Sequence, residues 1–259
     1  RALMDELFRE QILDDLDIER DRGITVKARA VALNHEFDGP QYELNLIDTP
    51  GHVDFGYEVS RSLAACEGAL LVVDAAQGVE AQTVANAFLA IESGLEIIPV
   101  MNKIDLSTAR PDEVDEELAQ TFGFHKGEAI RCSAKTGEGT DEILEAIVTF
   151  VPAPAGTRDI PLRALIFDSH YDEYRGVIVY LCVKEGRLST GQDIILMSSG
   201  RKFTVDEVGY FRPGMVASDV LEAGEVGYFF ASIKTIHDIK IGDTVTTRLN
   251  GATENLPGF

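Results

Sequence analysis

The sequence predicts an α/β domain built on a parallel sheet, followed by an all-β barrel. Up to about residue 150, apolar runs typical of strands alternate with segments of helical spacing, which favours a parallel sheet with helices on both faces. Beyond the proline-rich stretch VPAPAG at 151–156, short apolar runs are separated by glycine-containing turns, which is typical of a barrel of about 90 residues. We therefore expect domains at 1–154 and 155–250.

Composition indicates a folded, soluble protein. Hydrophobic residues make up 45% of the chain and charged residues 26%, and no apolar run reaches the roughly 18 residues of a membrane-spanning helix. The three cysteines form no disulfide framework and the five histidines show no zinc spacing, so a reducing cytoplasm is expected. Residues 1–157 carry 30 acidic and 12 basic side chains, against 14 and 11 in residues 158–259. This balance argues against a generic nucleic-acid binder.

The expected elements follow from periodicity and turn residues. Residues 1–22 carry an imperfect helical stripe that should end at Gly23. The turn at 38–40 predicts a hairpin of 31–37 with 42–47. A helix should follow residue 52. We then expect strands at 68–75, 96–102 and 129–133, helices at 79–93, 112–122 and 140–150, and barrel strands at 162–167, 177–183, 193–197, 203–208 and 226–233.

The stretch LNLIDTPGH at 44–52 predicts a buried strand that ends at a polar turn. In an open α/β sheet, ligands bind outside the carboxyl ends of the strands. The Asp48 carboxylate could there hold a hydrated Mg²⁺, and Gly51 would let the backbone approach a phosphate closely. The alternative is an ordinary Asp-Thr-Pro-Gly turn.

Two later strand ends repeat this arrangement, with NKID at 102–105 and SAK at 133–135. One carboxylate, Asp105, can accept both the N1–H and the exocyclic amine of guanine, a donor pair that adenine lacks. Each such hydrogen bond contributes roughly 1.5–3 kcal/mol. Asn102 could bridge the loops or reach the base edge, the Lys103 stem could cover the ring, and the Ala134 amide could meet the guanine carbonyl. The alternative is again a set of ordinary turns.

Together these motifs resemble a known family. Thr25 after Arg-Gly-Ile, DTPGH at 48–52, NKID and SAK resemble the switch and guanine motifs of translational GTPases. The stretch VDFGYEVSRSLAACEGA at 53–69 most resembles elongation factor 4, the LepA family. The resemblance covers essentially the whole chain and implies a P-loop-GTPase-type domain followed by a translation-factor barrel. The run SRSLAACE at 60–67 disfavours elongation factor G and the TypA/BipA type.

The resemblance implies a role for each motif residue. Thr25 would coordinate Mg²⁺ and sense the γ-phosphate, with Ile24 gating access of water, and Asp48 would hold Mg²⁺ through water. The Gly51 amide would contact the γ-phosphate, and His52 would be the catalytic residue that orients the attacking water; the alternative for His52 is a surface loop histidine. The implied GTP-binding residues are Thr25, Asp48, Gly51, Asn102, Lys103, Asp105, Ser133, Ala134 and Lys135.

The implied function is a ribosome-dependent GTPase that uses GTP and Mg²⁺ to remodel ribosome–tRNA complexes, through back-translocation and maintenance of fidelity under stress. Its partners would be rRNA, ribosomal proteins and tRNA-bearing complexes, without DNA. The protein would be a cytoplasmic monomer, with peripheral contact at the inner face of the membrane reported for the family. A non-hydrolysing ribosome-binding module is the alternative from another class.

The sequence departs from the family pattern in one motif. It contains no Gly-x-x-x-x-Gly-Lys-[Ser/Thr] loop, whose amides and lysine cradle the phosphates. We therefore expect a fragment that lacks this loop and the C-terminal domains, with 251–259 beginning the next domain. Such a fragment should be inactive by itself.

Overall fold

The computed structural model describes residues 25–212 and 214–257. These residues form two compact units. One unit comprises residues 35–42 and 51–152, and the other contains residues 43–50, those from Ala153 onward and the described residues up to Asn34. The predicted helix over 1–22 and the predicted gate Ile24 lie outside the described residues.

The first unit is built on a parallel sheet with strand order β3-β4-β5. Its strands are β3 (Gly68–Asp74), β4 (Glu96–Asn102) and β5 (Ile130–Arg131). Its helices are the 3₁₀ turn η1 (Val53–Phe55), α3 (Gly56–Leu63), α4 (Ala81–Glu92), α5 (Pro111–Phe122) and α6 (Thr140–Phe150). Each predicted strand and helix of this region is present, and the strand expected at 129–133 is shorter than predicted.

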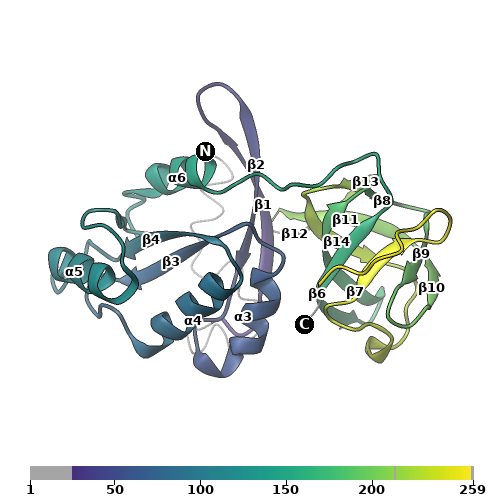
Figure 1. Cartoon of the computed structure of the whole chain (residues 1–259), viewed down its shortest axis with the longest axis horizontal. Coiled ribbons are helices and arrows are strands. Elements are labelled where there is room, and N and C mark those ends of the chain that lie inside the picture. The colour runs from purple at the N-terminus through teal and green to yellow at the C-terminus, as the bar shows by residue number, and fades with distance from the viewer. Residues whose placement is uncertain (1–24, 213, 258–259) are drawn as a thin grey trace. The chain divides into compact units, whose positions relative to one another are not determined.

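Helices cover both faces of this sheet because side chains alternate along its strands. Met101 of β4 packs with residues of α4 and α5, whereas its neighbour Val100 packs with residues of α6. Figure 1 shows α4 and α6 on opposite sides of β3 and β4. The expectation that 68–75 is covered on both faces is wrong at Val72, which is 54% exposed. The cluster around α6 has Ile98 and Val100 of β4 as its buried strand residues, so this helix covers the middle of the sheet.

The predicted hairpin is present as β1 (Arg29–Glu36) and β2 (Gln41–Asp48). Asp38 and Gly39 both have positive φ, 52° and 99°, the backbone that a tight two-residue hairpin turn requires. However, β2 pairs only with β1 in the described sheets and is half-buried at 44–47. The expectation that a buried strand delivers Asp48 is therefore wrong, because β2 has one hydrogen-bonded neighbour and only partial cover.

The second unit contains a predominantly antiparallel sheet with strand order β10-β9-β15-β6-β7-β14-β11-β12 and a separate β8–β13 pair. Its strands are β6 (Arg163–Asp172), β7 (Gly176–Glu185), β8 (Arg187–Ser189), β9 (Asp193–Leu196), β10 (Lys202–Thr204), β11 (Glu207–Arg212), β12 (Gly214–Ser218), β13 (Val220–Glu222), β14 (Val226–Phe230) and β15 (Thr244–Thr247), with the 3₁₀ turn η2 (Ile236–Asp238). Alternate residues such as Val179, Leu181 and Phe229 face one apolar core. The run expected at 203–208 divides into β10 and β11, since the Val205 amide still bonds the Gln192 carbonyl beside β9 at 3.0 Å, whereas the Asp206 amide bonds the Phe230 carbonyl of β14 at 2.9 Å.

Candidate functional site

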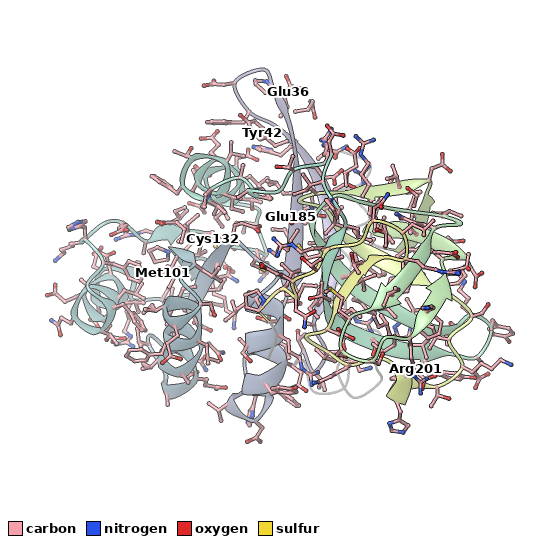
Figure 2. All side chains as sticks on the ribbon, turned by 45° about the vertical axis from the view of Figure 1, so that its right-hand side comes forward. Glu36, Tyr42, Met101, Cys132, Glu185 and Arg201 are labelled. Carbon is pink, nitrogen blue, oxygen red and sulfur yellow. The ribbon has the colours of Figure 1, made fainter. Side chains whose placement is uncertain are left out.

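The loops after β4 and β5 are joined through the Asn102 side chain. Its Oδ1 accepts hydrogen bonds from the Lys103 amide at 2.7 Å and from the Ala134 amide at 3.0 Å. Of the two roles predicted for Asn102, the structure shows the bridging one. The Cys132 amide also bonds the Met101 carbonyl at 2.8 Å, and both residues are labelled in Figure 2. Two sequence motifs about 30 positions apart thus form one surface.

Asp105 is exposed, but a buried side chain fixes its carboxylate. The Ser133 hydroxyl donates to Asp105 Oδ1 at 2.7 Å. Ser133 is fully buried, and its own oxygen accepts the Thr136 amide at 3.2 Å. A fixed, exposed carboxylate can accept two parallel donors from a planar ligand such as guanine. Lys135 lies in the exposed turn that follows Ala134.

A further residue, Asp74 at the end of β3, joins this surface. Its Oδ2 lies 2.8 Å from Lys103 Nζ, and its Oδ1 accepts the Ala76 and Gln77 amides at 2.7 and 3.3 Å. Burial alone would raise the pKa of Asp74, but the hydrogen bonds from Lys103 and the two amides lower it below its ordinary value. Sequence reasoning missed Asp74, although it ends an apolar run as Asp48 and Asn102 do.

His52 and Gly51 form the entry to η1. His52 is its N-cap, with Nδ1 accepting the Asp54 amide at 3.2 Å and the ring 53% exposed. The same nitrogen lies 3.4 Å from Asp54 Oδ2, but it cannot accept an amide proton and donate to a carboxylate at once. The contact with the Asp54 amide requires that Nδ1 carry no proton, whereas the contact with the carboxylate requires that it carry one. The Gly51 carbonyl accepts Asn86 Nδ2 of α4 at 3.0 Å, and open space surrounds the position that a Gly51 side chain would occupy.

Thr25 and Asp48 are brought together in the unit that contains the barrel. The Thr25 hydroxyl lies 3.4 Å from Asp48 Oδ2, just before β1 and at the end of β2. Hydroxyl and carboxylate oxygens are the ligand types that Mg²⁺ prefers. In residues 25–212 and 214–257, no group of three or more His, Cys, Asp or Glu side chains could hold a metal ion. A Mg²⁺ ion that keeps several waters needs only one or two protein oxygens, so the Thr25–Asp48 pair fits it.

The predicted residues thus fall into groups. Asn102, Lys103, Asp105, Ser133 and Ala134 share one network in the parallel-sheet unit. Gly51 and His52 belong to the same unit, and Thr25 and Asp48 form a pair in the other unit.

Comparison with known proteins shows the family of the chain. The model of the elongation factor Tu GTP binding domain matches residues 2–153. The chain belongs to this family. The model of elongation factor Tu domain 2 matches residues 176–246. Both matches confirm the predicted fold class, a GTPase-type parallel-sheet domain followed by a translation-factor barrel.

Relatives of the chain are named elongation factor 4, which confirms the resemblance seen in the sequence. The protein from Solibacter usitatus is 58% identical over the whole chain, which covers 43% of that protein. The protein from Synechocystis is 57% identical over 97% of the chain, which covers 42% of it. The chain thus spans less than half the length of these relatives.

A solved structure, the bacterial selenocysteine-specific elongation factor EF-Sec, shares the fold with a TM-score of 0.73 at 21% identity, covering 91% of this chain and 40% of that one. Within the described residues, no helix is long and apolar enough to cross a membrane.

Proposed function

We propose that the complete protein carrying this chain is a ribosome-dependent translational GTPase of the elongation factor 4 type. It hydrolyses GTP to GDP and phosphate. The observation that carries this proposal is the network around Asn102 and Ser133, which fixes one exposed carboxylate and links it to the adjacent strand-end loop.

The network suits guanine. The Asp105 carboxylate would accept the base N1–H and exocyclic amine, and the Ser133 hydroxyl would hold it in place. The Lys103 side chain would cover the face of the ring, and the Ala134 amide would approach the base carbonyl. Since the Ala134 amide bonds Asn102 Oδ1, it would share its hydrogen with the base or turn toward it.

Hydrolysis requires positioning and charge stabilisation more than covalent chemistry from the protein. The Gly51 amide would meet the γ-phosphate, and the open space where a Gly51 side chain would lie leaves the backbone accessible to it. His52 would orient the attacking water, and its exposed ring leaves room for one. Thr25 and Asp48 would hold Mg²⁺, which neutralises charge on the phosphate oxygens when bound.

The ribosome and its tRNA complexes would be the partners, and hydrolysis would drive remodelling such as back-translocation and fidelity under stress. Within this chain the barrel is the better candidate for ribosome contact, because residues 158–259 carry 14 acidic and 11 basic side chains, close to balance. A cytoplasmic monomer without a DNA partner is proposed. Helices α4, α5 and α6 have no basic residue, so peripheral membrane contact gains no support from them.

The test uses the protein expressed from its complete gene. Fluorescent GDP and GTP should bind and be displaced by guanine but not adenine nucleotides, and ribosomes should stimulate phosphate release. Equal displacement by ADP would contradict the guanine site. Binding to ribosomes without phosphate release would favour the non-hydrolysing module instead.

A further inference from the structure

We propose that Asp74 is a positioning residue that holds Lys103 in place beneath the guanine base and thereby slows nucleotide release. This inference rests on the proposed function, since it assigns a new residue to the same nucleotide site. It adds the third strand end, that of β3, to the two that the guanine motifs occupy.

The register of the sheet brings the two residues together. Asp74 is the Cα partner of Asn102 in the parallel β3–β4 ladder, so the carboxylate lies beside the start of the NKID loop. The Ala75 amide continues the ladder by bonding the Asn102 carbonyl at 2.8 Å. The Asp74 side chain is 16% exposed, and it places Oδ2 2.8 Å from Lys103 Nζ. A charge-assisted contact of this length is stronger than a hydrogen bond between neutral groups.

Lys103 needs such support because its backbone is strained. Its φ is +65°, in the left-handed region that residues other than glycine adopt only when their surroundings hold them there. Its carbonyl accepts the Leu106 amide at 3.1 Å, and two further contacts hold the amide and the side chain. Asn102 Oδ1 accepts the Lys103 amide at 2.7 Å, and Asp74 pairs with Nζ at the other end of the side chain. The four-carbon stem is thereby fixed at both ends, as a flat apolar support for a base requires.

Asp74 is itself fixed, which makes it suited to positioning. Its Oδ1 accepts the Ala76 and Gln77 amides of the following turn. Restricting the Lys103 side chain before the nucleotide arrives reduces the conformational entropy lost on binding.

Asp74→Asn is the direct test. The asparagine keeps a carbonyl oxygen for the Ala76 and Gln77 amides but loses the charge that holds Lys103. In the protein expressed from its complete gene, we expect the Kd for GDP to rise about threefold to tenfold through faster dissociation. The Kd for GTP should rise by the same factor, because Lys103 would contact the guanine base, which GDP and GTP have in common. Ribosome-stimulated kcat at saturating GTP should stay unchanged.

Glu117→Gln is the matched control. Glu117 of α5 holds the same turn by accepting the Val79 amide at 2.9 Å, and among the described ion pairs it has none with Lys103. The control should leave both Kd values within about twofold of the wild type. An equal rise in both variants would show that the turn, and not Lys103, matters, and would overturn the proposal.

A double-mutant cycle with Lys103→Gln completes the test, and it stays informative if Asp74→Asn lowers stability. In the Lys103→Gln background, Asp74→Asn should change the Kd for GDP by less than about twofold, because the interaction is already absent. Additive losses would overturn the proposal. Failure of the wild-type protein to bind GDP would instead refute the proposed function, so the two failures are distinguishable.

Discussion

Changing Asp105→Asn should convert the proposed guanine site into one that prefers xanthine. The amide keeps one oxygen, which can still accept the Ser133 hydroxyl now 2.7 Å from the carboxylate. Its amino group then faces the exocyclic amine of guanine, donor against donor. Two charge-assisted hydrogen bonds contribute about 3–6 kcal/mol, so the affinity for GDP should fall by about two to four decades. Xanthine has an oxygen where guanine has the amine, and this oxygen can accept from the new amide.

The assay is competition between fluorescent GDP and unlabelled GDP or xanthosine diphosphate, with the protein expressed from its complete gene. Asp105→Asn should bind xanthosine diphosphate more tightly than GDP. Ser133→Ala is the control, since it removes the hydroxyl that fixes the carboxylate but leaves the carboxylate itself. It should weaken GDP binding about threefold to thirtyfold without a gain for xanthine. An Asp105→Asn variant that still prefers GDP would refute the role assigned to Asp105.

Three further predictions concern hydrolysis, backbone strain and pH. His52→Ala should lower ribosome-stimulated kcat by about 10²–10⁴ and leave the Kd for GDP unchanged. Gly186→Ala should lower the melting temperature more than Gly191→Ala, because both have positive φ but only a side chain at Gly186 would meet backbone atoms at 2.7 Å. Burial raises the pKa of Glu225 in the folded protein, so the free energy of unfolding falls as pH rises from 4.5 through the folded-state pKa. In urea unfolding, the stability of Glu225→Gln relative to wild type should therefore increase above pH 4.5.

Local patterns in the sequence predicted most of the fold because the signals are strong where strands are buried. The apolar run that became β4 and the helix that became α6 have the predicted bounds. Weaker signals failed in the barrel. Three of the four residues of strand β15 (Thr244–Thr247) are threonine, and the strand is defined by its partners β6 and β9 instead of its own pattern. Pairing over a long sequence separation leaves no periodic trace in so short a segment.

Part of the candidate site could likewise be predicted from the sequence, and part could not. Asn102, Asp105 and Ser133 could be found because they stand at or just after the ends of apolar runs, and the network that joins them follows from parallel strands ending at one edge. The β1–β2 hairpin was predicted, but its separation from the β3–β5 sheet was not, since a strand pattern shows which residues form a strand and not which sheet the strand joins.

Asp74 shows why the ion pair with Lys103 could not be predicted from residue types. Each residue alone is an ordinary strand-end or loop residue, and their 2.8 Å contact depends on the β3–β4 register that sets Asp74 opposite Asn102. A one-residue shift of that register would reverse the faces of β3 and turn the carboxylate away. The buried positions Val73 and Met101, on the α5 face of their strands, resist such a shift because it would expose them. The apolar packing of the sheet therefore sets the position of a charge at its edge. A substitution at Val73 or Met101 should speed nucleotide dissociation and leave the preference for guanine, which Asp105 sets, unchanged.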